Sequence, residues 1–412
     1  MIEFLRREIR WIGAGFLLTF FSGFGQTYFI SLSNDAVRAR FDLTNGEIGA
    51  VYALATLTSA VVLLQFGKIV DRVSTRLAAL ITVGGLALAC LILSWAMAVW
   101  MLFLAYLGLR LFGQGMMSHV AMTATGRWFE ASRGRAVSLV ALGHPVSEAV
   151  MPALAVALLL GLGLQGLWTL AALALVILAA PLLIWLLSRE RAPRGNDPAV
   201  SVNAPPRKAS WRRRQVVGEP AFWLLLLGVL CPPFMVTGLF FHQLHLIQMK
   251  AWMPGTFAAG FTAFAATQMV SSLTAGWLID RFSARALLPM YLIPLALALC
   301  LPALFDGAWA IFAMMMLIGL TGGAAATVMG AIWPELFGPQ YLGEIRALTF
   351  AAMVAATSVA PILTGLLIDR GVAFTAQLVA MGGYALLASA LMGLIQPRLA
   401  RIASDRLAPA PA

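Results

Sequence analysis

Few residues inside the long apolar runs of this sequence can do chemistry, and three ionisable ones stand out: Arg110, His144 and Glu148. If these runs are helices in a bilayer, Arg110 lies about 11 residues, or roughly 16 Å, from the start of its run. Glu148 lies about 12 residues, or roughly 18 Å, from the near end of the next run. An unpaired charge at such depth costs at least ~2.5–3.5 kcal/mol, so both residues are functional candidates.

Two interpretations of Arg110 and Glu148 are open. Arg110 could hold an anion or control the protonation of Glu148, or the two could form a structural ion pair between adjacent helices. His144 precedes Glu148 by one helical turn and shares its face, and histidine titrates near neutral pH, which suits proton transfer. Alternatively, His144 donates a structural hydrogen bond to a backbone carbonyl beside Pro145.

Uncharged polar residues supply further candidates. Gln26 belongs to a polar stripe on the first apolar run, and we expect it to contact a bound molecule. Tyr28 faces elsewhere and is expected to pack, and His119 lies on the helix face opposite Arg110. The polar stripe on the first run contains Thr19, Ser22, Gln26 and Ser33. Gln268 is a further binding candidate, in the second half of the chain.

One apolar run, 220–248, contains a helix-breaking sequence. Cys231-Pro232-Pro233 lies near its middle and must interrupt the backbone hydrogen bonds there. His242, Gln243 and His245 lie near its far end, where we expect ordinary contacts at the interface with water rather than a gate.

Composition identifies the class of protein that positions these residues. Hydrophobic residues make up 61% of the 412, charged residues only 11%, and the mean hydropathy is +0.88. Soluble domains carry roughly 25% charge. The uncharged runs are long enough to cross a bilayer as helices, and the short alternating segments of barrel strands are missing. The sequence therefore predicts an all-α integral membrane protein.

Twelve runs are expected, in two groups of six. They are predicted at 11–32, 46–66, 77–94, 99–126, 136–160, 166–187, 220–248, 256–276, 286–304, 309–332, 346–367 and 373–395. The corresponding domains are an N-terminal six-helix bundle (1–187), a cytosolic linker (188–218), a C-terminal six-helix bundle (219–397) and a cytosolic tail (398–412).

Basic residues indicate the orientation. Nearly all Lys and Arg lie in segments on the same side as the N-terminus, so this side is expected to be cytosolic. The exceptions are Arg110 within a run and four residues on the other side: Arg38, Arg40, Lys250 and Arg370. Because the +11 net charge follows topology, we expect no nucleic-acid partner. The three cysteines lie inside apolar runs and predict no disulfide framework.

A repeated decamer shows that the chain is duplicated. Gly67-Lys-Ile-Val-Asp71-Arg72-Val-Ser-Thr-Arg76 recurs as Gly276-Trp-Leu-Ile-Asp280-Arg281-Phe-Ser-Ala-Arg285, each between two apolar runs. A second repeat pairs Trp128-Phe-Glu130 with Trp333-Pro-Glu335. Two similar six-helix halves are typical of a large class of transporters.

These motifs resemble the major facilitator superfamily. The decamers are similar to its loop motif G-x-L-a-D-r-x-G-r-R, with Ser74 and Ser283 in place of a glycine. Arg110-Leu-Phe-Gly113-Gln114-Gly115 is similar to its fourth-helix motif R-x-x-x-G-x-G, which adds Gln114 to the binding candidates. The resemblance implies two pseudo-symmetric six-helix bundles and a latch that closes the cytosolic side. The latch candidates are Gly67, Asp71, Arg72, Arg76, Arg127, Glu130, Gly276, Asp280, Arg281, Arg285, Glu335 and Arg346.

The resulting prediction is a secondary active transporter, not an enzyme. It would move a small organic solute, an organic anion in the first instance, by proton-coupled symport and alternating access. A loose resemblance of Trp333-Pro-Glu-Leu-Phe-Gly to bacterial monocarboxylate and oxalate–formate-type porters agrees with this and implies a bacterial cytoplasmic (inner) membrane. The alternatives are a proton-driven efflux pump for amphipathic compounds and a transporter-like receptor. We expect no cofactor, no metal site, no P-loop and a monomer.

Overall fold

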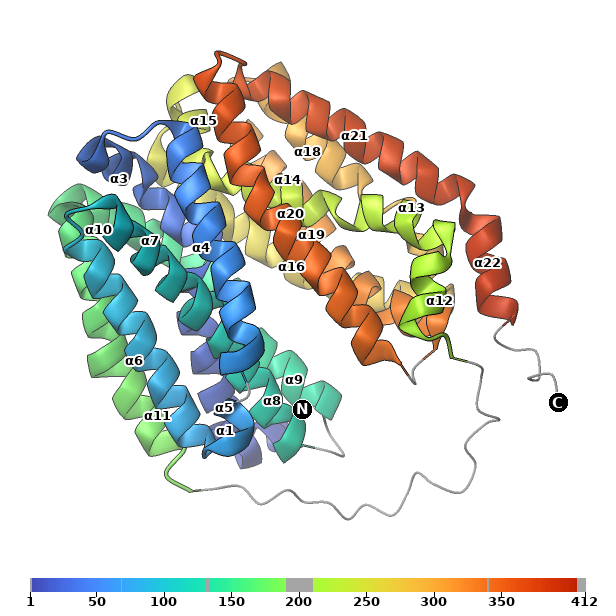
Figure 1. Cartoon of the computed structure of the whole chain (residues 1–412), viewed down its shortest axis with the longest axis horizontal. Coiled ribbons are helices and arrows are strands. Elements are labelled where there is room, and N and C mark those ends of the chain that lie inside the picture. The colour runs from blue at the N-terminus through green and yellow to red at the C-terminus, as the bar shows by residue number, and fades with distance from the viewer. Residues whose placement is uncertain (1, 68, 130–132, 190–209, 339–340, 406–412) are drawn as a thin grey trace. The chain divides into compact units, whose positions relative to one another are not determined.

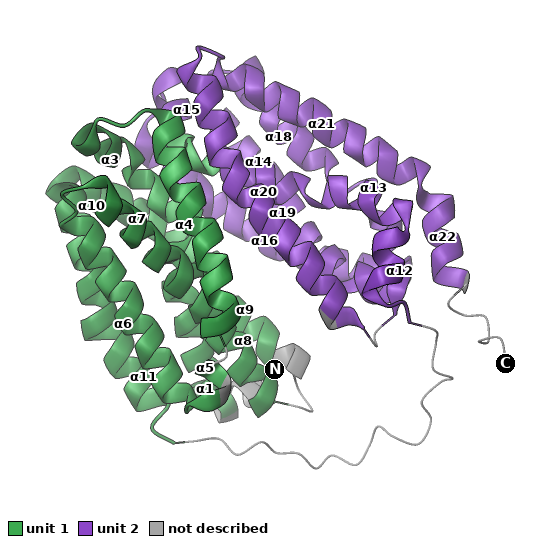
Figure 2. Cartoon of the chain, in the orientation of Figure 1, with its two compact units in different colours: residues 1–199, 240–244 green, residues 200–239, 245–412 purple. Residues whose placement is uncertain are grey.

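The computed structural model describes residues 2–67, 69–129, 133–189, 210–338 and 341–405, and every regular element among them is helical (Figure 1). Eight helices in this part of the chain are long and apolar enough to cross a membrane. The chain forms two compact units (Figure 2). Unit 1 comprises residues 1–199 and 240–244, and unit 2 comprises residues 200–239 and 245–412.

Unit 1 contains six helical passes. Its elements are α1 (Ile2–Phe21), η1 (Ser22–Gly25), α2 (Thr27–Ile30), η2 (Ser31–Ser33), α3 (Asn34–Phe41), α4 (Asn45–Phe66), α5 (Ile69–Arg72), α6 (Thr75–Ser94), α7 (Val99–Gly108), η3 (Leu109–Met117), α8 (Ser118–Trp128), α9 (Arg133–Ala141), α10 (Gly143–Ala174), η4 (Leu175–Ala179) and α11 (Ala180–Leu186). Within α10, Gly163 has φ 65° and ψ −173°, and this turn separates the fifth pass from the sixth. The turn predicted between 160 and 166 is therefore confirmed.

The first pass is not the single helix that the sequence predicted. Ser22–Gly25 tighten into a 3-10 turn and Gln26 is extended, with φ −84° and ψ 149°. Two glycines in four residues make this departure inexpensive, because glycine adopts non-helical conformations readily. The first pass is thus discontinuous at mid-length.

The fourth pass departs from the α-helix as well. Leu109–Met117 form a nine-residue π-helix between α7 and α8. π-Helical segments are rare and occur frequently at functional sites. This one contains the motif residues from Arg110 to Gly115.

Local capping explains where other helices begin and end. Thr44 and Glu47 form a capping box at the start of α4, and Ser74 accepts a hydrogen bond from the Leu77 amide at the start of α6. A side chain also serves the end of α11, where Arg10 donates to the carbonyls of Trp185 and Leu186. These are among the last carbonyls of α11, which lack partners within the helix.

Unit 2 supplies six further passes. Its elements are α12 (Arg213–Gly218), α13 (Pro220–Val229), α14 (Cys231–Phe241), α15 (Gln243–Met249), α16 (Pro254–Arg281), α17 (Ala284–Leu287), α18 (Ile293–Leu304), α19 (Trp309–Phe337), α20 (Leu342–Asp369), α21 (Phe374–Leu394) and α22 (Gln396–Asp405). The predicted break at Cys231-Pro232-Pro233 is confirmed, since α13 ends at Val229 and α14 begins at Cys231. Of the segment expected as a tail, the described residues 398–405 are helical, with Leu399 and Ile402 buried.

Small residues bring α16 and α19 close together. A Cβ added at Gly323 would lie 2.7 Å from the Ser272 backbone nitrogen, so only glycine fits this approach. Ser271 Oγ donates to the Leu320 carbonyl at 2.5 Å. Close backbone approach through small residues and interhelical hydrogen bonds holds helices together where apolar burial provides little preference.

Gln243 occupies a different environment from the one expected. It is fully buried, and its Nε2 donates to the Tyr28 carbonyl at 2.9 Å and to Ser31 Oγ at 2.8 Å. Asn34 Nδ2 donates in turn to the Phe241 carbonyl at 2.9 Å. These bonds explain why Phe240–Leu244 belongs to unit 1 although the rest of that pass belongs to unit 2. The expectation of an ordinary contact at the interface with water is wrong for Gln243.

Candidate functional site

Arg110 is buried in unit 1, with 3% of its surface exposed. Its Nη1 donates to the Gly25 carbonyl at 3.3 Å and to Thr27 Oγ1 at 3.4 Å. Its guanidinium carbon lies 5.3 Å from the centroid of the Tyr52 ring, within the range of a cation–π contact. Its Nε has no hydrogen-bond partner. All these partners are uncharged, so the positive charge is hydrogen-bonded but not neutralised.

The break in the first pass lies directly against the π-helix. A Cβ added at Gly113 would lie 2.6 Å from the Gly25 Cα and 2.9 Å from the Gly25 nitrogen. The two backbones can approach this closely only because both residues are glycine. The Gly25 carbonyl, released from regular helical bonding by the break, thereby comes within reach of Arg110.

A hydroxyl relay extends from the break to the second pass. Thr27 Oγ1 and the Tyr52 hydroxyl lie 2.7 Å apart, and Tyr52 packs edge-on against Tyr106. Both tyrosines are fully buried, and the Tyr106 hydroxyl has no hydrogen-bond partner. Thr27 and Tyr52, which both contact the Arg110 guanidinium, are therefore also joined to each other, and both are uncharged.

Glu148 lies on α10 with one oxygen, Oε2, buried and without a hydrogen-bond partner. Its neighbour Ser147 lies 2.9 Å from the Tyr28 hydroxyl, and Tyr28 is close enough to Glu148 for an electrostatic interaction. No ion pair joins Arg110 to Glu148 in the described part of the chain. The structure thus offers no support for the structural-pair interpretation, and both groups are available for other partners.

His144 joins three passes of unit 1. Its Nδ1 lies 3.2 Å from Ser22 Oγ and its Nε2 lies 3.4 Å from Ser118 Oγ. Both ring nitrogens therefore meet hydroxyls rather than the backbone carbonyl that was the alternative expectation. Because a hydroxyl can donate or accept, the arrangement accommodates either tautomer of the ring.

The three glutamine candidates are distributed over both units. Gln26 is half-buried at the extended residue of the break, and Gln114 is half-buried in the π-helix. Gln268 lies in unit 2 beside Gly322, and its Oε1 is buried without a hydrogen-bond partner.

Thr27, Tyr52 and Ser147 were not predicted from the sequence. For Thr27 the spacing carried no signal, because the break at Ser22–Gln26 rotates the residues that follow relative to the polar stripe. Tyr52 and Ser147 lie on other passes, α4 and α10, and only the packing brings them to this region. Tyr28 was expected only to pack, but its hydroxyl lies within hydrogen-bonding distance of Ser147.

The first decamer is tied to the fourth pass. Arg127 Nη1 donates to the Val70 carbonyl at 3.1 Å, and His119 Nε2 lies 3.2 Å from the Gly67 carbonyl. Arg72 and Arg76 are exposed. The Asp71 side chain and Glu130 lie outside the described residues.

The second decamer closes on the tenth pass. Glu335 accepts a hydrogen bond from the Ala284 amide at 2.7 Å and lies 3.7 Å from Arg285 Nε. Arg281 packs against Trp277 and Phe282, while Asp280 is exposed. Gly276 is half-buried, and Arg346 donates to the Gly330 carbonyl at 2.8 Å.

Comparison with known proteins shows which family has this architecture. A model of the Major Facilitator Superfamily matches residues 15–260 and 243–411. A bacterial homolog of the human lysosomal transporter Spinster, inward-facing and unoccupied, superposes with a TM-score of 0.70 at 15% identity over 98% of each chain. Its occupied form gives 0.71 at 17% identity over 96% of this chain and 98% of that one. The nucleoside transporter NupG gives 0.68 at 14% identity over 94% and 99%. No curated protein matches significantly.

Fold and site together define a multi-pass membrane transporter built from two six-helix bundles, and not an enzyme. The chain belongs to the Major Facilitator Superfamily, whose model matches nearly its whole length. Its substrates are accordingly small molecules bound within the membrane.

Proposed function

We propose that this transporter carries small organic anions and that Arg110 binds the anionic group. The observation that supports the proposal is the buried Arg110 guanidinium, which has only neutral partners. Removing a charge from water is costly unless an opposite charge compensates it. A substrate carboxylate would supply that compensation and could use the unpartnered Nε through the planar guanidinium fork.

The backbone around Arg110 supports the same proposal. Substrate sites of transporters typically lie where helices are discontinuous, because unwound backbone there presents unpaired polar groups. Unit 1 has such a discontinuity at Ser22–Gln26 and a π-helix beside it at Leu109–Met117. The porter resemblance of Trp333-Pro-Glu-Leu-Phe-Gly agrees with a carboxylate substrate.

We further propose that Glu148 carries the coupled proton, which makes the transporter a proton symporter. A buried carboxylate oxygen without a partner is costly, and a proton relieves that cost directly. His144, one turn away on the same face, lies within hydrogen-bonding distance of hydroxyls of two other passes. Gln26 and Gln114 complete the proposed set of substrate contacts in unit 1, and Gln268 is the candidate that unit 2 contributes by itself.

The decamers act in this proposal as the latch of the cytosolic side. In unit 2 the Glu335 carboxylate holds the Ala284 amide and Arg285, and in unit 1 Arg127 holds the Val70 carbonyl. The positive-inside distribution supports cytosolic termini in a bacterial cytoplasmic membrane. The functional unit is a monomer.

Uptake by purified protein in proteoliposomes tests the proposal. Two panels of compounds are assayed, one of mono- and dicarboxylates and one of amphipathic cations. Each is tested with and without an inwardly directed proton gradient, in which the outer solution is the more acidic one. We expect gradient-driven accumulation of a carboxylate. Accumulation of the cations alone would overturn the anion assignment in favour of an efflux pump, and binding without flux of any compound would favour a receptor.

Replacing Glu148 by Gln tests the coupling separately. The amide cannot exchange a proton, so we expect Glu148→Gln to abolish accumulation driven by the pH gradient while exchange of labelled for unlabelled substrate persists. Preserved exchange shows that the site is folded. Gradient-driven uptake at the wild-type rate in this variant would show that the proton travels elsewhere.

A further inference from the structure

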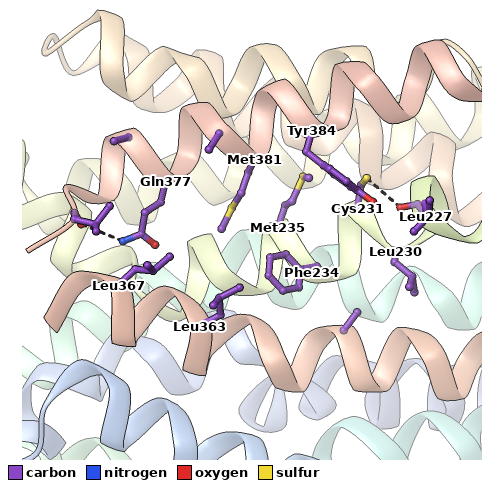
Figure 3. A pocket seen from close by; sticks show the side chains of 14 residues that line it. Leu227, Leu230, Cys231, Phe234, Met235, Leu363, Leu367, Gln377, Met381 and Tyr384 are labelled. Atoms are coloured by element: carbon purple, nitrogen blue, oxygen red, sulfur yellow. Dashed lines mark hydrogen bonds between the residues drawn. The ribbon is translucent and has the colours of Figure 1, made fainter. Parts of the chain in front are cut away.

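Unit 2 contains a cavity of about 560 Å³ that the proposed transport site does not use. It lies between α13–α14, α20 and α21, and its walls include Phe234, Met235, Leu363, Met381 and Tyr384 (Figure 3). Its volume falls within the range of ligand pockets, roughly 300–1,000 Å³, and far exceeds the voids of a packed interior. Leu363 and Tyr384 remain more than 40% exposed, so the cavity opens onto the surface of the unit.

The cavity is an elongated slot that exists because of small residues. On α21 the lining residues follow one helical face, and two of them, Ala376 and Ala380, are alanines. Ala356 on α20 faces the same space. The break at Leu230 brings Cys231 into the wall from the third side. Larger residues at the alanine positions would fill the slot.

Gln377 contributes a buried amide to this largely apolar slot. Gln377 is 5% exposed, and its Nε2 donates to the Val372 carbonyl at 3.1 Å. Its Oε1 is buried without a hydrogen-bond partner, and Figure 3 shows the amide at one end of the lining. A buried amide oxygen without a donor is unfavourable. Among the lining residues, Gln377 thus supplies a buried acceptor without a partner, and none of these residues is charged.

The polarity of the slot matches a membrane amphiphile. Gln377 is three residues from the first residue of α21, near the helix end and hence near the membrane surface, whereas Tyr384 lies two turns deeper. A head group that donates a hydrogen bond would meet Gln377, and an alkyl chain would extend inward along Ala380 and Met381.

From this arrangement we infer that the α14–α20–α21 slot binds an uncharged single-chain lipid of the bilayer, whose hydroxyl or amide N–H donates to Gln377 Oε1. The site is confined to unit 2 and is independent of the anion site proposed in unit 1.

Photolabelling of the full-length protein in nanodiscs tests this inference. The probe is a monoacylglycerol with a diazirine in its acyl chain, and labelled peptides are mapped by mass spectrometry. We expect labelling in 356–367 and 376–384, with unlabelled monoacylglycerol competing at least tenfold better than the methyl ester of the same fatty acid. Equal competition by the ester, which lacks a donor, would overturn the role of Gln377.

Matched variants locate the site. Ala380→Trp should abolish the labelling by filling the slot, whereas Leu387→Trp, at a residue 66% exposed on the same helix, should leave it unchanged. Gln377→Leu should weaken monoacylglycerol labelling about tenfold but retain labelling by a diazirine methyl ester, which confirms that the slot is intact. Labelling of Ala380→Trp at the wild-type level would refute the inference.

Discussion

At the scale of single residues, the site combines two ionisable groups whose bonding is incomplete. Arg110 is buried among a carbonyl, a hydroxyl and an aromatic ring, and Glu148 has a buried oxygen without a partner. A structural pair would satisfy both groups at once, as the hydroxyls of Thr27 and Tyr52 satisfy each other at 2.7 Å. Incomplete bonding is expected where a ligand and a proton supply the missing partners in turn.

Replacing Arg110 by Lys should separate charge from geometry. Lysine keeps the positive charge but cannot present two parallel N–H groups to a carboxylate. We expect Arg110→Lys to weaken substrate binding at least about tenfold, which corresponds to about 1.4 kcal/mol, and Arg110→Ala to weaken it further. Substrate-induced changes in intrinsic fluorescence or calorimetric titration would measure both. Wild-type affinity in Arg110→Lys would exclude a two-point clamp on the substrate.

Arg110 and Glu148 could be predicted from the sequence, but the residues that surround them could not. Their depth in apolar runs is a signal visible in composition alone. The partners Gly25, Thr27 and Tyr52 depend on a helix break and a π-helix, and helical periodicity cannot reveal a local change in periodicity. His119 lies 3.2 Å from the Gly67 carbonyl, which is not among the partners of Arg110.

At the scale of elements, the central feature is the contact between the break in the first pass and the π-helix of the fourth. Both depart from α-helical geometry at the same place, and Gly25 and Gly113 let them touch. The π-helix presents the Arg110 side chain toward the carbonyl that the break exposes. The break thus supplies the Gly25 carbonyl as an acceptor, and the π-helix supplies Arg110 as its donor.

A single methyl group should disturb this contact. Gly113→Ala would place its Cβ 2.6 Å from the Gly25 Cα, so the backbones must separate. Overpacking of this kind typically costs about 1–3 kcal/mol, and we expect a lower apparent Tm together with weaker substrate binding. Gly84→Ala is the matched control, because no atom lies within 4 Å of the added Cβ and alanine favours the helix. Equal effects of the two substitutions would contradict the proposed contact.

The two decamers show how far a motif specifies an element. Ser74 and Ser283 take the place of the family's glycine, and each caps the helix that follows. Ser74 has an ordinary extended conformation, whereas Ser283 has φ 142°, a value that favours glycine. Corresponding positions of two similar motifs therefore have different backbone conformations, which the sequence repeat alone could not predict. The serine cap explains why the substitution is tolerated.

At the scale of the whole molecule, the twelve passes and their division into two sets of six followed from hydropathy and the duplicated motifs. The assignment of Phe240–Leu244 to unit 1 could not be predicted in this way, because it depends on hydrogen bonds between residues more than 200 positions apart in sequence. Polar residues near the end of an apolar run resemble ordinary contacts with interfacial water. Only the three-dimensional packing shows that Gln243 is buried against the first pass.

Weakening these bonds should release the segment measurably. Gln243→Leu removes the donor to the Tyr28 carbonyl and to Ser31 Oγ while keeping a buried side chain of similar size. Two hydrogen bonds worth about 1 kcal/mol each should raise amide hydrogen exchange of residues 240–244 roughly ten- to thirtyfold. Met249→Ala, at an exposed position of the same helix, should leave this exchange unchanged. Unaltered protection of 240–244 would show that Phe241 and its contact with Tyr52, at 4.7 Å between ring centroids, hold the segment without Gln243.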